Sequence, residues 1–339
     1  MEPLENIYPL LTEPRKVVIT THQKPDADAL GSSLALYHFL NQFGHQITVI
    51  SPTNWPDFLN WMPDSQRVVD YEANNAAAVR AIDTADWIFC LDFNVLSRTK
   101  RMEEKLMGSP AIKILIDHHR EPQGEVFHYG KSDTGKSSTA EMIYDFILES
   151  GHGNLINERI SECLYAGVMT DTGSFRFNSS SSSVHKMVSH LKEAGLDHSR
   201  IHEDLYDNFL EGRFRFIGHV LLNRMEVFYE YNTALIVVPQ VDLIKFDVRT
   251  GDTEGLVNYP LSIKGIKLAA VIIDRGEERK SSFRSKGDFD VNSFARKYFN
   301  GGGHFNAAGG FNKEALDIVV QKFKSAMKEN AELLTSYQF

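Results

Sequence analysis

Short apolar runs alternate with helical segments along the first half of the chain. Four runs are rich in Val, Ile and Leu and are therefore typical of buried strands. These are KVVIT (16–20), QITVI (46–50), DWIFCLD (86–92) and IKILID (112–117). Between the first two runs, Leu30, Leu34, Tyr37 and Asn41 follow helical spacing, and Gly44 suits a helix end.

Two further helices are expected in this half. Ser138 and Glu141 have the spacing of a capping box, which predicts a helix over 138–150, and a second helix is expected over 157–170. Strands that alternate with helices predict a mainly parallel sheet covered on both faces. The sequence therefore predicts an α/β fold.

The second half has a different pattern. The serine run NSSSSS (178–183) predicts a loop, and a charged, helical segment follows to about residue 230. Strands are predicted at 233–238, 267–274 and 280–285, helices near 291–299 and from about 313, and a glycine-rich run at 301–310. We therefore expect a parallel-sheet domain over 1–183, a helical connector over 184–231 and a smaller mixed α/β domain over 232–339.

Composition limits the kind of partner. The 339 residues are 42% hydrophobic and 24% charged, as in ordinary globular proteins, and carry a net charge of −9. An acidic chain is unsuited to wrapping long duplex nucleic acid, but it can hold a short phosphorylated ligand through a few basic groups and metal ions.

The cysteines and the N-terminus indicate a compartment. Cys90 and Cys163 are the only cysteines and lie in apolar runs, so they are interpreted as buried thiols in a reducing environment. The first residues are acidic where a signal peptide is basic, and no apolar run has the ~20 residues that span a bilayer. A cytoplasmic protein without membrane contact is expected.

Acidic and imidazole side chains gather where the predicted strands end. Because ligands of open α/β sheets bind outside the carboxyl ends of the strands, these side chains are candidate site residues. They are His22, Asp26, Asp28, Asp92, Asp117, His118, His119 and, at the end of a helix, Asp171. Asp171 follows Ile160, Leu164 and Val168 on one helical face and should point inward with them.

Clustered carboxylates predict bound cations. Several carboxylates cannot stay ionised together without neutralising charge, and Asp and His ligands without Cys suit Mn²⁺, Mg²⁺ or Fe²⁺. Two ions ~3.5–4 Å apart are the usual arrangement for phosphoester hydrolysis. The alternative for any single residue, such as Asp28, is that it caps the next helix.

The motifs HQKPDAD, LDFN, IDHH and MTDTGSF, in this order, resemble the DHH phosphoesterase superfamily. SFRS followed by GGGHFNAAG resembles its associated C-terminal domain, and the similarity spans about residues 15 to 310. Within the superfamily, the branch of small oligoribonucleases that also dephosphorylate 3′-phosphoadenosine 5′-phosphate matches best. The resemblance implies hydrolysis by a hydroxide shared between two divalent ions, for which Mn²⁺ is preferred.

The resemblance also implies a role for each residue. His22 and Asp26 would hold one ion, Asp28, His118 and Asp171 the other, and Asp92 both. His119 would lie near the scissile phosphate, and Asp117 would hold a neighbouring imidazole in its ligating tautomer. The role of Arg98, which also fits the family pattern, stays open.

The glycine-rich run predicts a substrate-binding element in the C-terminal domain. Its backbone can approach a ligand closely, and the nearby Arg284 can bind a phosphate with two hydrogen bonds. The expected substrate-binding residues are Arg284, Gly301, Gly302, Gly303 and His304. The resemblance implies that this domain binds the terminal nucleotide and presents the next phosphate to the metals, and the alternative is a plain glycine-rich turn.

A second motif competes with this interpretation. Residues 130–137, GKSDTGKS, satisfy the phosphate-binding-loop pattern of nucleotide triphosphatases. That loop should directly join a buried strand to a helix, whereas the preceding GEVFHYG is short and polar. A triphosphatase would also leave the Asp and His residues unexplained.

We therefore expect a metal-dependent phosphoesterase that converts very short RNA to mononucleotides and 3′-phosphoadenosine 5′-phosphate to AMP. A phosphodiesterase for cyclic or linear dinucleotides is the alternative enzyme, and a catalytically inactive nucleotide sensor on the same scaffold is the alternative from another class. A homodimer is compatible with the sequence, although no surface signature supports it.

Overall fold

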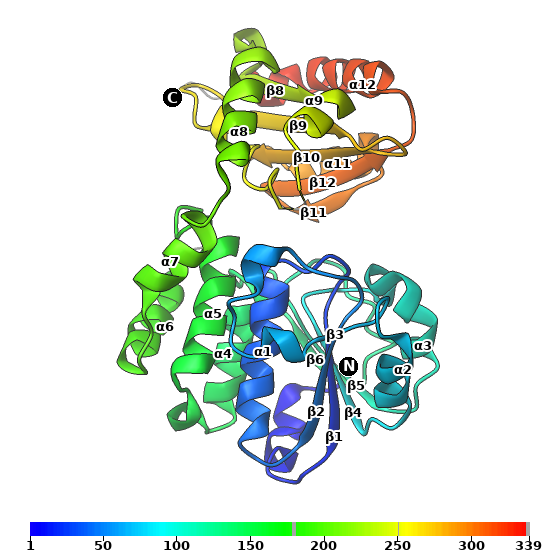
Figure 1. Ribbon diagram of the computed structural model, residues 1–339, viewed down its shortest axis with the longest axis vertical. Helices are drawn as coiled ribbons and strands as arrows, with labels where there is room; N and C mark the ends of the chain where they lie inside the picture. The colour runs from blue at the N-terminus through cyan, green and yellow to red at the C-terminus, as the bar shows by residue number, and fades with distance from the viewer. Residues whose placement is uncertain (178–180, 250, 337–339) are drawn as a thin grey trace. The chain divides into compact units, whose positions relative to one another are not determined.

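The computed structural model describes residues 1–177, 181–249 and 251–336. Within these residues the chain forms two compact units, Met1–Asn208 and Phe209–Phe339, each with its own sheet (Figure 1). In the same described ranges, no helix is long and apolar enough to cross a membrane.

The first unit is built on a parallel sheet, as the sequence predicts. Over the described residues this sheet has six strands in the order β3-β2-β1-β4-β5-β6. They are β1 (Lys16–Thr20), β2 (Gln46–Ser51), β3 (Val69–Asp70), β4 (Trp87–Leu91), β5 (Ile112–Asp117) and β6 (Tyr129–Ser132). The strand order runs outward from the neighbouring β1 and β4, so the topological switch point lies between these two strands.

Helices cover both faces of this sheet (Figure 1). Val17 and Ile19 of β1 pack in one core with α1, α4 and α5, whereas Val18 lies in the other core with α2 and α3. The helices of the first unit are α1 (Ala27–Asn41), α2 (Asn75–Asp83), α3 (Glu103–Met107), α4 (Thr139–Glu149), α5 (Glu158–Asp171), α6 (Ser182–Glu193) and α7 (His198–Tyr206). Cys90 and Cys163 are buried free thiols.

Short 3₁₀ helices complete both units. They are η1 (Leu4–Asn6), η2 (Tyr8–Leu10), η3 (Asp57–Leu59), η4 (Ser65–Arg67), η5 (Leu96–Met102), η6 (Gly153–Leu155) and η7 (Tyr229–Tyr231).

Three helices on one face, α1, α4 and α5, pack at very short range. A Cβ atom at Gly31 of α1 would lie 2.4 Å from the carbonyl oxygen of Cys163 in α5, and one at Gly167 would lie 2.7 Å from both Ala140 and Asp28. Real Cβ atoms do not approach that closely, so glycine is needed at both positions. This close packing brings Asp28 against the start of α4.

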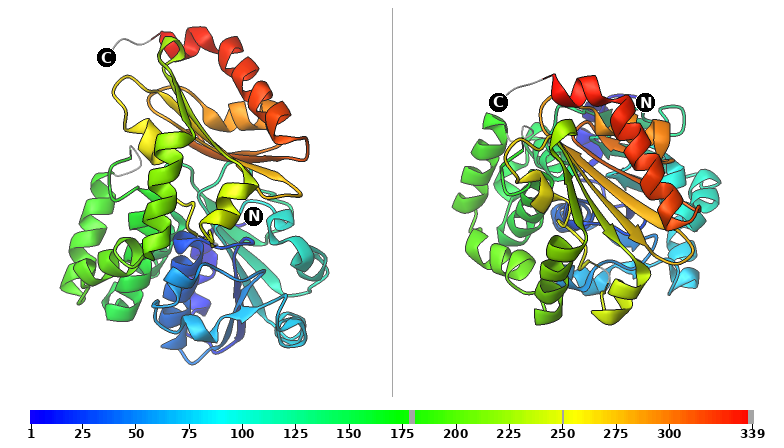
Figure 2. Two further views of the ribbon diagram at one scale, coloured as in Figure 1. Left: turned by 45° about the horizontal axis from the view of Figure 1, so that its top comes forward. Right: turned by 90° about the horizontal axis from the view of Figure 1, so that it is seen from above.

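The second unit has a mixed sheet with helices on both faces (Figure 2). Among its described residues the sheet contains six strands in the order β11-β12-β10-β9-β8-β7, with only β8 and β9 parallel. They are β7 (Met225–Phe228), β8 (Thr233–Val238), β9 (Leu268–Asp274), β10 (Arg279–Ser285), β11 (Gly302–His304) and β12 (Ala307–Asn312). The expected mixed α/β unit is thus confirmed.

One face of the second sheet packs on α11 and α12, and the other on α8 and α10. The helices of this unit are α8 (Glu211–Asn223), α9 (Gln240–Lys245), α10 (Asn258–Leu261), α11 (Val291–Tyr298), α12 (Leu316–Glu329) and α13 (Ala331–Thr335). The division into a catalytic domain (1–183), a connector (184–231) and a substrate-binding domain (232–339) assigns a function to each segment and stays a prediction.

The sequence interpretation was wrong in several places. The segment before the phosphate-loop-like motif is not only a short polar one, because Phe127 is buried and β6 runs through YGKS (129–132). The segment 184–230 is not helical throughout, because β7 begins at Met225. Both strands are four residues long and lie at sheet edges, so neither has the long apolar run that marks a central strand. Of the predicted serine loop, residues 178–180 lie outside the described ranges. The prediction was wrong at Ser182 and Ser183, which begin α6 with Ser181 as the N-cap.

The close packing of α1 on α5 gives a stability prediction. We expect Gly31→Ala to destabilise the first unit by about 1–3 kcal/mol, because the added methyl group meets a backbone oxygen that cannot move independently. Scanning calorimetry measures the change. The control is Gly218→Ala in α8, where the new methyl group meets nothing within 4 Å and should stabilise its helix by about 0.5–1 kcal/mol. Equal effects of the two substitutions would contradict the packing argument.

Candidate metal centre

The predicted ligand residues of the first unit converge at the carboxyl ends of three neighbouring strands. His22 lies two residues beyond β1, Asp92 directly follows β4, and Asp117 ends β5. His118 and His119 continue from β5, and Asp171 is the last residue of α5. This edge adjoins the switch point between β1 and β4, where ligands of open α/β sheets bind.

Potential ligand atoms form overlapping clusters here. One cluster contains His22, Asp26 and Asp92, and a second contains Asp28, Asp92 and His118, with the ligand atoms of each within 4.8 Å of one another. Asp92 belongs to both clusters. The family resemblance assigns these residues, and Asp171 in addition, to two ions with Asp92 shared. The assignment of individual ions stays a prediction.

His22 is oriented by its own backbone environment. The ring is buried, its Nδ1 donates to the carbonyl oxygen of Gln23 at 2.8 Å, and its Nε2 lies 3.3 Å from Asp92 Oδ2. A proton on Nδ1 leaves Nε2 as the nitrogen that can ligate a metal.

His118 faces three carboxylates. Its Nε2 lies 3.4 Å from Asp92 Oδ1, 3.4 Å from Asp171 Oδ2 and 3.8 Å from Asp28 Oδ2. These separations exceed the 2.7–2.9 Å of charge-assisted hydrogen bonds. The arrangement surrounds one imidazole nitrogen with oxygen ligands from three different segments.

Asp117 orients His119. The carboxylate is fully buried; its Oδ1 accepts from His119 Nδ1 at 2.7 Å, and its Oδ2 accepts from the His119 backbone amide at 3.1 Å. The pair fixes the orientation of the imidazole, with its proton on Nδ1.

The backbone of Asp92 adopts a strained conformation. Its φ of 63° is in the left-handed region, which costs a non-glycine residue free energy, and such residues cluster at functional sites. The Arg98 guanidinium donates to the Asp92 carbonyl oxygen at 3.3 Å, and the Asp92 amide donates to Ile116. These contacts hold the side chain at the centre of the cluster.

The carboxyl groups influence one another strongly. Burial, reinforced by the charges of Asp92 and Asp171, raises the pKa of Asp28 well above its usual range. Burial also opposes ionisation of Asp92, but the adjacent imidazoles of His118 and His22 outweigh it and hold the Asp92 pKa well below its usual range. Against the effect of burial, the nearby carboxylates of Asp92, Asp171 and Asp28 raise the pKa of His118 to about 10. Without added positive charge, this cluster retains protons.

The donor set fits divalent cations. Carboxylate oxygens and imidazole nitrogens without a thiolate suit Mn²⁺, Mg²⁺ or Fe²⁺. Cations would replace the retained protons, so metal binding should release protons and strengthen as the pH rises.

The start of α4 supplies contacts that the sequence did not reveal. The Asp28 carboxylate accepts from the backbone amides of Thr139 at 2.7 Å and Ala140 at 2.8 Å, while the Thr139 hydroxyl donates to Asp92 Oδ1 at 3.0 Å. The alternative that Asp28 caps the next helix was therefore wrong, because Asp28 lies within α1, whose N-cap is Asp26. Its carboxylate instead accepts from the first amides of α4. Thr139 was missed because SSTAE also has a complete explanation as a helix start.

Glu141 anchors this helix start. The carboxylate is buried and accepts from the Ser137 amide at 2.8 Å, the Ser183 hydroxyl at 2.8 Å and Lys136 Nζ at 3.2 Å. Burial disfavours its charge, but these donors prevail and lower the Glu141 pKa. Ser138 is the N-cap of α4 and accepts from the Glu141 amide. The return contact of the predicted capping box is shifted, because the Glu141 carboxylate accepts from the amide of Ser137, one residue before the N-cap.

In the second unit, Arg284 and His304 lie on the two strands that flank β12. Arg284 of β10 and His304 of β11 both pair with Ala307 of β12, so the three side chains share one face of the sheet. Phe283 and Ala308 pack in the core with α11 and α12, so Arg284 lies on the opposite face. The small Ala307 leaves space between the arginine and the imidazole.

The glycine run is explained in part by packing. A Cβ atom would lie 1.9 Å from the Gly309 oxygen at Gly301 and 2.5 Å from the Ala307 oxygen at Gly303, whereas the closest atom at Gly302 would be 3.4 Å away. Gly301 and Gly303 are thus required by the strand β12 itself. Substrate contact by these glycines stays a prediction.

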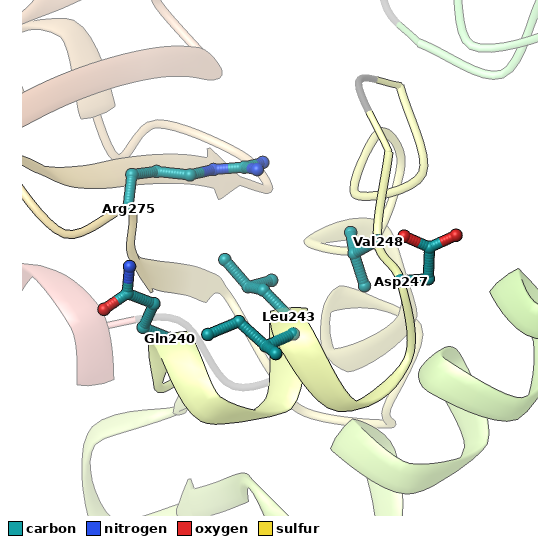
Figure 3. Close-up of a pocket in the computed structure, with 6 residues that line it drawn as sticks. Gln240, Leu243, Asp247, Val248 and Arg275 are labelled. Carbon is teal, nitrogen blue, oxygen red and sulfur yellow. The ribbon is translucent and has the colours of Figure 1, made fainter.

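A separate hollow in the second unit does not include these residues. It has a volume of about 400 Å³ and lies beside α9, with Arg275 extended from the end of β9 (Figure 3). Its lining consists of Gln240, Leu243, Ile244, Asp247, Val248 and Arg275.

A parallel α/β sheet with carboxylate and imidazole clusters at its switch point defines the class of metal-binding α/β hydrolases. The comparisons name the family. The DHH family N-terminal domain matches residues 16–168, and the DHHA1 domain matches residues 232–330. The chain belongs to the DHH phosphoesterase family, as its motifs suggested.

Similar proteins extend over almost the whole chain. An exopolyphosphatase-related protein from Bacteroides fragilis is 39% identical, with a TM-score of 0.92 and 97% of each chain covered. The bifunctional oligoribonuclease and PAP phosphatase NrnA of Bacillus subtilis (strain 168) is 27% identical over 93% of this chain and 95% of its own. RecJ from Thermus thermophilus in complex with Mn²⁺ shares the fold, with 12% identity and a TM-score of 0.52 over 97% of this chain and 55% of its own.

Glu141 gives a pH prediction. Its pKa is lower in the folded than in the unfolded chain, so its stabilising contribution is complete above the unfolded value of about 4.3 and is lost as the pH falls through the folded value. We expect the free energy of unfolding of Glu141→Gln, measured by urea unfolding, to fall less than that of the wild type as the pH drops below about 4.3. Glu203→Gln, at an exposed position of α7, is the control. An unchanged pH dependence would refute this role.

Asp92 gives a metal prediction. Because Asp92 belongs to both clusters, we expect Asp92→Asn to weaken binding of both Mn²⁺ ions, measured by isothermal titration calorimetry on the metal-stripped protein. Asp86→Asn is the matched control, because Asp86 lies beside the opposite end of β4 and binds the Lys16 amide. Wild-type affinity for two ions in Asp92→Asn would rule out a shared ligand.

Proposed function

We propose that this protein hydrolyses very short oligoribonucleotides to mononucleotides and 3′-phosphoadenosine 5′-phosphate to AMP, with two divalent ions. The observation that carries the proposal is the pair of ligand clusters that share Asp92 at the switch point. Relatives of nearly equal length named as oligoribonuclease and PAP phosphatase, from Bacillus subtilis and Thermus thermophilus, support the substrates.

Each proposed residue has a chemical task. When bound, the cations supply charge neutralisation and an activated water for in-line attack at phosphorus. His22, Asp26, Asp28, Asp92, His118 and Asp171 are the proposed ligands. His119 is the proposed contact to the scissile phosphate, since the hydrogen bond between its Nδ1 and Asp117 fixes the orientation of the ring.

The second unit is proposed to bind the nucleotide. Arg284 can donate two parallel hydrogen bonds to a phosphate, and His304 on the same sheet face can add a third donor. Arg284, Gly301, Gly302, Gly303 and His304 are the proposed substrate-binding residues. The acidic balance of the whole chain supports short substrates over long duplexes. Mn²⁺ is the proposed metal.

A dinucleotide phosphodiesterase is the second candidate. The cyclic-di-AMP phosphodiesterase GdpP of Bacillus subtilis is 24% identical over 95% of this chain, which spans about half of that protein. Since the same metal site can cleave a dinucleotide, the two candidates differ in the substrate they bind best.

The test is product formation by metal-stripped protein after Mn²⁺ is restored. Dinucleotides to pentanucleotides of RNA, 3′-phosphoadenosine 5′-phosphate, cyclic dinucleotides and polyphosphate are compared in parallel. We expect the highest kcat/KM with the shortest RNAs and the bisphosphate, and a loss on the order of 10²–10³-fold in Asp92→Asn because transition-state charge loses its counterions.

Lys136→Ala is the control that separates this proposal from a nucleotide triphosphatase. Lys136 Nζ pairs with Glu141 at 3.2 Å and Asp145 at 2.6 Å, so its loss should change phosphoesterase activity little. Preferred hydrolysis of polyphosphate or cyclic dinucleotides would refute the substrate assignment. Tight nucleotide binding without turnover in any divalent metal would favour the sensor.

A further inference from the structure

The phosphate-loop-like sequence at 130–137 leads into α4, whose N-terminus binds an anion. In a phosphate-binding loop that anion is a nucleotide phosphate. Here it is the carboxylate of Asp28, which lies 1% exposed and accepts from the first two amides of α4, Thr139 and Ala140. The helix start therefore binds a side chain of its own protein.

Thr139 makes a second contact, to a different carboxylate. Its hydroxyl donates to Asp92 Oδ1 at 3.0 Å, and the residue is completely buried. Along the chain, Asp28 lies 111 residues before Thr139, and Asp92 lies 47 residues before Thr139. One residue thus joins two proposed metal ligands that come from separate segments, Asp28 from α1 and Asp92 from the end of β4.

We propose that Thr139 is a positioning residue of the metal centre, whose amide and hydroxyl orient Asp28 and Asp92 for metal binding. The inference rests on the proposed function. A carboxylate offers about four lone-pair directions, so fixed donors from α4 occupy some and leave the others directed at the cations. Groups that orient ligands in this way typically contribute 10–100-fold to metal affinity.

The hydroxyl is not needed to start the helix. Ser138 accepts from the Glu141 amide, and Glu141 accepts from the Ser137 amide, so the capping contacts of α4 involve other residues. Removing the Thr139 hydroxyl should therefore leave α4 in place and change the orientation of Asp92.

The experiment compares Thr139→Val, Thr139→Ala and Thr139→Ser by titration calorimetry with Mn²⁺ and by electron paramagnetic resonance of the bound ions. We expect Val and Ala to weaken Mn²⁺ binding about 10–100-fold and to alter the Mn²⁺ spectrum, and Ser to retain affinity and spectrum close to wild type. The control is Thr233→Val in the second unit, where a buried hydroxyl donates to the Tyr231 carbonyl oxygen.

Three outcomes would overturn the positioning role of Thr139, the proposed function or both. Wild-type Mn²⁺ affinity in a folded Thr139→Val protein overturns the positioning role; should that variant not fold, equal affinities of the Ala and Ser variants overturn it. A wild-type protein that binds Mn²⁺ but hydrolyses no substrate refutes the proposed function, and the effect of the Thr139 variants on affinity still supports the positioning role. A wild-type protein that binds no Mn²⁺ overturns both.

Discussion

The repulsion among buried carboxylates at one sheet edge is the constraint on which the rest of the first unit depends. Asp28 and Asp92 are almost fully buried, and Asp171 faces the same imidazole nitrogen as they do. Such a cluster is stable only where donors, protons or cations compensate it. The amides of α4, the histidines and the proposed metal ions all supply that compensation. The contacts that stabilise the fold at this edge are therefore the same ones that prepare the carboxylates for metal binding.

The packing of three helices makes this compensation possible. Asp28 can reach the amides of α4 only because α1, α4 and α5 approach one another at glycines, Gly31 and Gly167. A larger residue at Gly167 would occupy the space of the Asp28 carboxylate. Larger side chains are therefore excluded from these helix contacts because they would separate Asp28 from the amides that compensate its charge. A substitution far from the sheet edge can disturb the site in the same way, by changing the spacing of the helices.

Much of the fold could be predicted from the sequence because the patterns that indicate its strands and ligand residues lie within short segments of the chain. The central strands β1 and β5 lie where the apolar runs of Val, Ile and Leu placed them, and the ligand residues are short polar breaks directly after such runs. The edge strands β6 and β7 were missed because they are short and only half buried. The contacts of Thr139 and Gly167 were missed because they join segments distant in the sequence, and neither residue type signals a partner by itself.

The same locality explains why a motif can mislead. GKSDTGKS carries the spacing of a phosphate-binding loop because both structures need a tight turn before a helix whose N-terminus binds an anion. The sequence pattern predicts the geometry of the turn, but it does not predict which anion the helix N-terminus binds. Here Lys136 pairs with Glu141 and Asp145, and Asp28 takes the amides. An anion-binding helix start can therefore serve a metal centre indirectly, by orienting the carboxylates that would bind the cations.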